Sequence, residues 1–150
     1  MATQTVSGLT IPSIQAQDFL TVADLSTDEL HAVLDLATQL KAMRKVREPH
    51  RILDGQSIAL YFEKPSNRTR VSFEVGINDF GAHPIMLRKE EINLGVRETI
   101  ADTARTLSRF VDGIMIRTFA HQDIQDLAKW STVPVINGLD DEHHPCQIIA

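Results

Sequence analysis

Two polar segments of this 150-residue sequence combine residue types that can bind and activate a small charged molecule. The first, residues 62–74, follows an apolar run at 58–62 that is typical of a buried strand. The second is His144-Pro145-Cys146-Gln147, after a later apolar run. Hydroxyls, guanidiniums and free backbone N–H groups at a helix N-terminus bind phosphate, and a histidine with an amide can polarise and orient a carbonyl group. Together the segments indicate an enzyme that acts on a phosphorylated small molecule.

The hydroxyls and guanidiniums of the first segment are spaced closely enough to meet at one helix end. Ser66 can cap the helix and donate its hydroxyl to an oxyanion, and Arg68 can hold a phosphate through two parallel hydrogen bonds. Thr69 adds a hydroxyl and a backbone N–H. Arg70 has two possible partners, the ligand or Glu74 one turn later. The simpler alternative is a plain helix cap with solvated arginines.

This segment lacks the features of a nucleotide-binding loop. It contains no glycine-rich run and no Gly-Lys-Ser/Thr sequence, which a Walker loop would need after the strand. A dinucleotide fingerprint requires glycines at the same place. A nucleotide is therefore not indicated.

Three further residues have side chains suited to a carbonyl group. Arg117 ends the apolar run 114–116, so it is either a site residue or a surface residue at the edge of a sheet. His144 and Gln147 lie at the start of another expected helix, and with an arginine they could polarise a carbonyl and orient its amide. The alternative is a surface turn in which Pro145 merely begins the helix.

Neither a zinc site nor a cysteine nucleophile is supported by the residues around Cys146. The chain has one cysteine, and His143 and His144 do not form a His-x-x-x-His pattern. Catalytic Cys–His pairs are usually distant in sequence, whereas Cys146 and His144 are near neighbours. No metal ligands are assigned.

Composition limits the class of protein and its partners. The length suits one domain with a real core, and 43% hydrophobic and 23% charged residues are ordinary for a globular protein. The net charge of −5 argues against nucleic acid or an anionic membrane as the main partner. No apolar run approaches the roughly 20 residues of a membrane span, and residues 1–17 do not read as a secretory signal. A single cysteine fits a reducing, cytoplasmic setting.

Strand and helix patterns alternate from residue 57 onward. After a polar tail at 1–17, the capping box Ser26–Glu29 predicts a first helix to about Lys45. Short apolar runs predict strands at 57–62, 84–87, 113–117 and 133–137. Helical spacing predicts helices at 71–80, 99–111 and 122–130. Such alternation indicates an α/β domain of three layers, with a mainly parallel four-stranded sheet flanked by helices.

The candidate residues fall where these strands end. In parallel sheets ligands lie outside the carboxyl ends of the strands. The four expected exits are residues 64–70, 88–95, 117–120 and 138–147, and they contain every candidate named above. This coincidence is the strongest physical argument for a site.

The ordered motifs resemble the aspartate/ornithine carbamoyltransferase family from about Asp18 to the last residue, so residues 18–150 correspond to its carbamoyl-phosphate-binding domain. The resemblance rests on Ser66-Asn67-Arg68-Thr69-Arg70, Arg117 and His144-Pro145-Cys146-Gln147. Features similar to the ornithine branch are Leu94-Gly95, Glu98, residues 102–109, residues 112–114 and Cys146.

The resemblance implies a role for each site residue. Ser66, Asn67, Arg68 and Thr69 would bind the phosphate of carbamoyl phosphate, Asn67 through its backbone. Arg117 would bridge the phosphate and the carbonyl oxygen, His144 would contact that oxygen, and Gln147 would contact the carbamoyl amino group. In the family a loop from a neighbouring subunit of a trimer also reaches the phosphate, and the matching position here is Asn93.

The implied activity is transfer of the carbamoyl group to the δ-amine of ornithine, giving citrulline and phosphate without metal or redox cofactor. Other acceptors (aspartate, putrescine or acetylornithine) and a non-catalytic carbamoyl-phosphate-binding module remain alternatives. The family's acceptor-binding domain is absent from these residues, so the chain alone is expected to be inactive. The resemblance also implies a cytoplasmic homotrimer in arginine metabolism and amino-acid biosynthesis, and leaves the anabolic or catabolic direction open.

Overall fold

A parallel sheet of four strands forms the centre of the computed structural model, which describes residues 4–6 and 8–150. The strands stand in the order β4-β3-β5-β6, and each neighbouring pair is parallel. Their bounds are His83–Arg88 for β4, Ser57–Phe62 for β3, Gly113–Arg117 for β5 and Val135–Leu139 for β6. The expected α/β fold class is confirmed.

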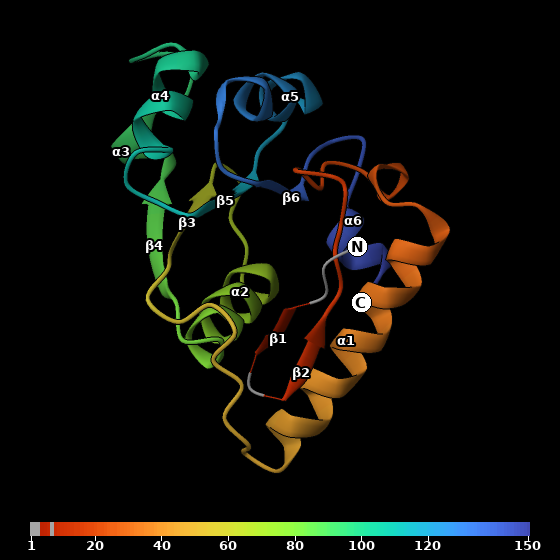
Figure 1. Cartoon of the computed structure of the whole chain (residues 1–150). Coiled ribbons are helices and arrows are strands. Elements are labelled where there is room, and N and C mark those ends of the chain that lie inside the picture. The colour runs from red at the N-terminus through yellow and green to blue at the C-terminus, as the bar shows by residue number, and fades with distance from the viewer. Residues whose placement is uncertain (1–3, 7) are drawn as a thin grey trace.

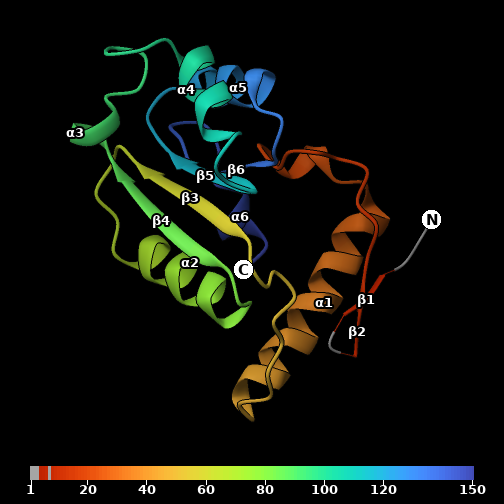
Figure 2. The same ribbon diagram turned by 60° about the vertical axis from the view of Figure 1, so that its left-hand side comes forward.

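Helices cover both faces of this sheet (Figures 1 and 2). Helices α4 (Ile100–Leu107) and α5 (His121–Trp130) pack on one face, and α2 (Arg68–Asp79) packs on the other. Side chains alternate along a strand, so Ala59 and Tyr61 of β3 enter the first core while Leu60 enters the second. Strands buried on both faces explain why the sequence shows short, continuous apolar runs.

The segment before the first long helix protects the outer edge of β6. The Phe19 N–H donates to the Val135 carbonyl oxygen at 2.8 Å, and the Asn137 N–H donates to the Phe19 carbonyl oxygen at 2.9 Å. The Asp18 carboxylate also accepts the Val135 N–H at 2.8 Å. These bonds satisfy backbone groups that an open edge would leave unpaired.

Helix α1 (Thr27–Lys45) stands beside the sheet rather than on it (Figure 2). Its predicted capping box is confirmed, with the Glu29 carboxylate 2.9 Å from the Ser26 N–H. None of its residues is fully buried. Next to it lies a hairpin of β1 (Gln4–Val6) and β2 (Leu9–Ile11). The short helices are η1 (Val22–Asp24), α3 (Lys89–Ile92) and α6 (Pro145–Ile148).

The bounds of β3, β5 and α1 agree with the sequence-based expectation, but other elements differ from it. The hairpin lies within the segment expected to be a polar tail; of that segment, residues 1–3 and 7 lie outside the described residues. Helix α2 begins at Arg68 rather than near residue 71, and β6 extends to Leu139. Helix α4 ends before Ser108, whose hydroxyl donates to the Ala104 carbonyl oxygen at 2.8 Å.

Gly138 lets the end of β6 lie close against β5, and we predict that Gly138→Ala destabilises the domain. A Cβ atom there would overlap the sulfur of the fully buried Met115 and lie 3.2 Å from the Ile116 carbonyl oxygen. The expected loss of unfolding free energy is about 1–3 kcal/mol, measured by urea denaturation. The matched control is Gly76→Ala, because the added Cβ would meet no atom within 4 Å beyond its own helix backbone, and alanine favours a helix interior. Equal stability of the two variants would contradict the prediction.

Candidate functional site

The register of the sheet brings the exits of β3 and β5 together. Phe62, the last residue of β3, pairs with Arg88 of β4 and with Arg117 of β5. The ladder continues one step further, because the Glu63 N–H donates to the Arg117 carbonyl oxygen at 2.8 Å. The loop that follows β3 therefore starts directly beside Arg117 and leads into α2.

Arg117 reaches the first turn of α2. Its Nη1 atom lies 3.3 Å from the Thr69 hydroxyl oxygen, which joins residues that are 48 positions apart in sequence. Burial lowers the pKa of the Arg117 guanidinium, which nevertheless keeps its charge at neutral pH. Its Nε atom is buried and has no hydrogen-bond partner among the described residues. Such a group is suited to an anionic ligand with several oxygen atoms.

His144 lies at the N-cap of α6, and Pro145 occupies the first helical position as the sequence predicted. Burial lowers the pKa of His144, and the nearby Arg117 charge lowers it further, while Asp140 acts in the opposite direction. Its Nδ1 atom is buried without a partner in the described part of the chain. At neutral pH the ring is therefore uncharged and can donate one hydrogen bond and accept one.

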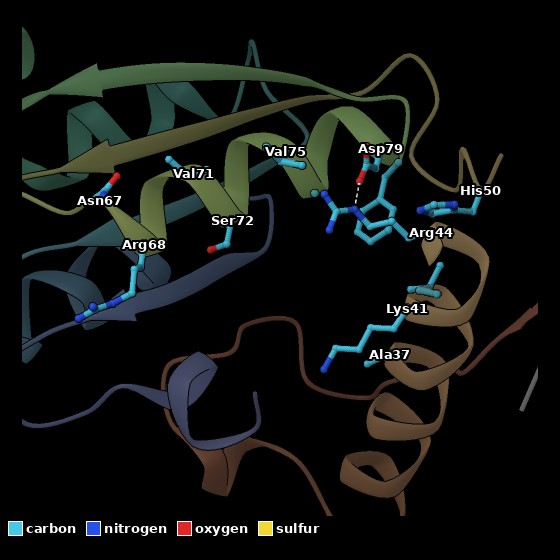
Figure 3. Close-up of a pocket in the computed structure, with 13 residues that line it drawn as sticks. Ala37, Lys41, Arg44, His50, Asn67, Arg68, Val71, Ser72, Val75 and Asp79 are labelled. Atoms are coloured by element: carbon cyan, nitrogen blue, oxygen red, sulfur yellow. Dashed lines mark hydrogen bonds and ion pairs between the residues drawn. The ribbon is translucent and has the colours of Figure 1, made fainter. Parts of the chain in front are cut away.

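The positive end of α2 forms the third part of the site. Asn67 is the N-cap residue, its backbone is helical, and its side chain makes no capping bond. The expectation that Ser66 caps this helix is wrong, because the Asn67 carbonyl oxygen accepts the first helical hydrogen bond, from the Val71 N–H at 2.9 Å. Arg68 is the first helical residue, and Figure 3 shows it extending from that end of α2. The helix dipole and free N–H groups favour an anion here.

Arg70 makes the second of its two predicted contacts. Its Nη2 atom lies 3.4 Å from the Glu74 carboxylate, one turn along the helix. Two other predicted residues lie on the short helices α6 and α3. Gln147 occupies an exposed position on α6. Asn93 lies at the C-cap of α3 beyond the exit of β4, with left-handed backbone angles of φ 50° and ψ 57°.

Two polar clusters beside the site were not predicted as site elements. Lys64 forms an ion pair with Asp141, and its ammonium group lies 4.5 Å from the centre of the Phe119 ring. Glu63 accepts hydrogen bonds from the Thr118 hydroxyl and from Lys89, the latter at 2.8 Å. All of these residues lie at strand exits, and that location was the one signal in the sequence that could have indicated them.

A groove of about 630 Å³ lies between α1 and α2 and was not foreseen (Figure 3). Lys41 and Arg44 line it from α1, while Arg68 and Val71 line it from α2. Arg44 crosses the groove and binds the Asp79 carboxylate at 2.7 Å. Because only Asn67 and Arg68 belong to both places, the groove is largely separate from the strand exits.

The described residues contain neither a metal-binding cluster nor a membrane-spanning helix. No group of three or more histidine, cysteine, aspartate or glutamate side chains is arranged to hold a metal ion there. Within the same residues, no helix combines the length and the apolar character needed to cross a membrane.

Comparison with known proteins decides the family. Residues 17–150 match the family described as aspartate/ornithine carbamoyltransferase, carbamoyl-P binding domain. The chain belongs to this family. It is 49% identical over 140 residues to the ornithine carbamoyltransferase of Thermococcus kodakarensis, a match that covers 93% of this chain and 44% of that protein. The chain thus spans less than half the length of this relative.

Solved structures of the family share the fold. The ornithine carbamoyltransferase from Pyrococcus furiosus superposes with a TM-score of 0.87 at 48% identity, covering 89% of this chain and 43% of that one. The catalytic subunit of aspartate transcarbamoylase from M. jannaschii has a TM-score of 0.79 at 27% identity, covering 89% and 44%. The resemblance inferred from the motifs is confirmed.

The neighbouring positive charge is expected to hold down the pKa of His144, so Arg117→Gln should raise it. Burial persists in the variant, so the pKa should rise but stay below its ordinary value of 6.5. Histidine ring signals followed by NMR through a pH titration would measure the change, with Arg70→Gln as the control. An unchanged or lower pKa in Arg117→Gln would contradict this origin of the shift.

The same shift has a consequence for stability. The folded chain holds a neutral His144 ring, whereas the unfolded chain binds a proton near pH 6.5. His144 therefore reduces the free energy of unfolding as the pH falls below the unfolded value, and this contribution should shrink in Arg117→Gln.

Proposed function

We propose that this chain supplies the carbamoyl-phosphate half of an ornithine carbamoyltransferase. The observation that carries the proposal is the contact between Arg117, at the end of β5, and Thr69, in the first turn of α2. The contact brings a guanidinium to a helix N-terminus suited to phosphate, and the charge of the same guanidinium acts on the neutral ring of His144, which is suited to a carbonyl oxygen. Carbamoyl phosphate carries both groups, a carbonyl and a phosphate joined through one bridging oxygen.

The phosphate would bind at the N-terminus of α2. Ser66 and Thr69 donate hydroxyl hydrogen bonds, Asn67 contributes its backbone N–H, and Arg68 binds two phosphate oxygens. Arg117 spans the phosphate and the carbonyl oxygen through its fork of N–H groups. The charge of the leaving phosphate is then balanced before the reaction begins.

The carbamoyl group would lie toward β5 and α6. The acceptor amine attacks the carbamoyl carbon and loses a proton, a C–N bond forms, and the C–O bond to phosphate breaks. Charge collects on the carbonyl oxygen in the tetrahedral state, where Arg117, His144 and Thr69 can stabilise it. Removal of one such donor typically lowers the rate about 10²–10³-fold. Gln147 would bind the carbamoyl amino group and so orient the plane of the substrate.

The acceptor is ornithine in this proposal, because the relatives described above carry that name. Aspartate, the substrate named for a more distant structural neighbour, is the second candidate. Putrescine, acetylornithine and a non-catalytic binding module are further alternatives. We also propose a cytoplasmic homotrimer in arginine metabolism, in which Asn93 reaches the phosphate of an adjacent subunit.

Arg68→Ala is expected to weaken binding of inorganic phosphate by about 2–3 kcal/mol, because a charge-assisted contact with two hydrogen bonds is lost. Isothermal titration calorimetry on the 150-residue chain measures the change. Arg70→Ala is the matched control, since that arginine lies on the same helix but pairs with Glu74. Equal losses in both variants would indicate a diffuse charge effect and refute the proposed phosphate contact.

The chain alone is expected not to form citrulline. Holding the acceptor amine against the carbonyl contributes up to about 7–11 kcal/mol in well-oriented reactions, and the residues described here bind only the electrophile. The assay compares residues 1–150 with the same residues fused to the remaining part of the Thermococcus kodakarensis relative. Rapid turnover by the short chain would overturn the division into two halves. An inactive fusion that still binds phosphate would favour another acceptor or a binding module.

A further inference from the structure

Asp140 is a buried carboxylate in the loop between β6 and His144. Its side chain has 0% exposure. Four donors surround it: the His121 Nδ1 atom at 2.6 Å, the Asn137 amide at 2.8 Å, and the backbone N–H groups of Glu142 at 2.7 Å and His143 at 2.6 Å. An ionised carboxylate can be buried only when hydrogen bonds of this kind replace its hydration.

The donors come from three parts of the fold. His121 begins α5, Asn137 lies in β6, and the two N–H groups belong to the loop itself. Asn137 is also fully buried and uses all its polar atoms, because it donates to the Leu20 carbonyl oxygen at 2.9 Å and accepts the Leu139 N–H at 2.9 Å. His121 and Asn137, on α5 and β6, therefore hold one end of the interaction, and the carboxylate in turn holds the backbone of the loop.

The charge of Asp140 is maintained by this arrangement. Burial alone would raise the pKa of Asp140, but the bonds from His121 and the two backbone N–H groups hold it below its ordinary value. The proton of His121 lies on Nδ1, since the carboxylate oxygen can only accept. The ring of His143 packs edge-on against that of His121, with 4.7 Å between their centres.

We propose that Asp140 is a positioning residue for His144: it fixes the backbone of residues 140–143, and His121 holds its carboxylate in place. The inference rests on the proposed function, because it assumes that His144 contacts the carbamoyl group. His144 follows this loop directly, so a change in the backbone at 142–143 moves the ring. None of the residues proposed to bind phosphate belongs to this loop.

The other charged groups near His144 come from β5 and from the loop itself. Arg117 approaches from β5 and lowers the pKa of His144, whereas Asp140 raises it. Asp141, in the same loop, is engaged in its ion pair with Lys64. Asp140 thus has two separable effects on His144, one on its place and one on its charge.

The test compares Asp140→Ala, Asp140→Asn and the wild type by calorimetry with two probes, inorganic phosphate and phosphonoacetamide. Only the second probe carries a carboxamide. In Asp140→Ala the preference for phosphonoacetamide should fall about tenfold or more, because two charge-assisted bonds to the loop backbone are lost, while phosphate affinity stays unchanged. Asp140→Asn should recover part of the preference, since its amide oxygen can accept the same two backbone N–H groups, while its NH2 group cannot accept from Asn137. Glu142→Gln, an exposed change in the same loop, is the control.

NMR provides a readout that does not depend on ligand binding. In Asp140→Asn the pKa of His144 should fall, because the negative charge is gone while the loop is kept. In Asp140→Ala the Glu142 and His143 amides should exchange with solvent faster, at an unchanged far-UV circular dichroism spectrum. Preserved amide protection and an unchanged probe preference in Asp140→Ala would overturn the inference. A wild-type chain that binds neither probe would instead refute the proposed function, and the NMR results would still decide the role of Asp140 in the loop.

Discussion

The pairing of Phe62 with Arg117 determines where the site can form. A slip of β3 by one residue would turn Ala59 and Tyr61 toward α2 and Leu60 toward α4 and α5. In the observed register, the core under α4 and α5 contains Ala59 and Tyr61, and the core under α2 contains Leu60 and Met115. After a slip, the β3 side chains would enter the wrong core and would not fit the space there. The packing of two apolar faces thus fixes the register, and the register places the guanidinium of Arg117 beside the first turn of α2.

Arg117 and Asp140, the two charged groups that shift the pKa of His144, differ in how fully they are hydrogen-bonded. Arg117 has a buried Nε atom without a partner in the described part of the chain, so part of its capacity for hydrogen bonds is unused. Asp140 is saturated by four donors. A carboxylate whose hydrogen bonds are all made holds its surroundings rigidly. A guanidinium with unused N–H groups can still donate hydrogen bonds to an oxyanion. Both charges act on the ring of His144, since Arg117 lowers its pKa and Asp140 raises it.

The sequence was sufficient for those parts of the fold that depend on local pattern. Continuous apolar runs predicted β3 and β5, and the capping-box pattern of Ser26 and Glu29 predicted the start of α1. The start of α2 was misplaced because Asn67 and Arg68 have no apolar pattern, and the end of β6 was misplaced because Gly138 resembles a turn. For the candidate site, residue types and strand exits were enough to predict that Arg117 and Thr69 lie together, whereas their roles stay predictions. The role of His121 and Asp140 depends on a contact between α5 and the last loop, which no local pattern reveals.

The bonds between residues 18–20 and β6 affect the order in which the chain can fold during synthesis. Asp18 and Leu20 pair with Val135 and Asn137, which are 117 positions later in the sequence. On the ribosome, at about 5–20 residues per second, the first partners emerge roughly 6–23 s before the second. The early segment must remain unpaired over that time, although β3, α2 and β5 are already available to fold. Because Asn137 binds both Leu20 and Asp140, the loop that carries His144 is tied to a segment made much earlier in synthesis.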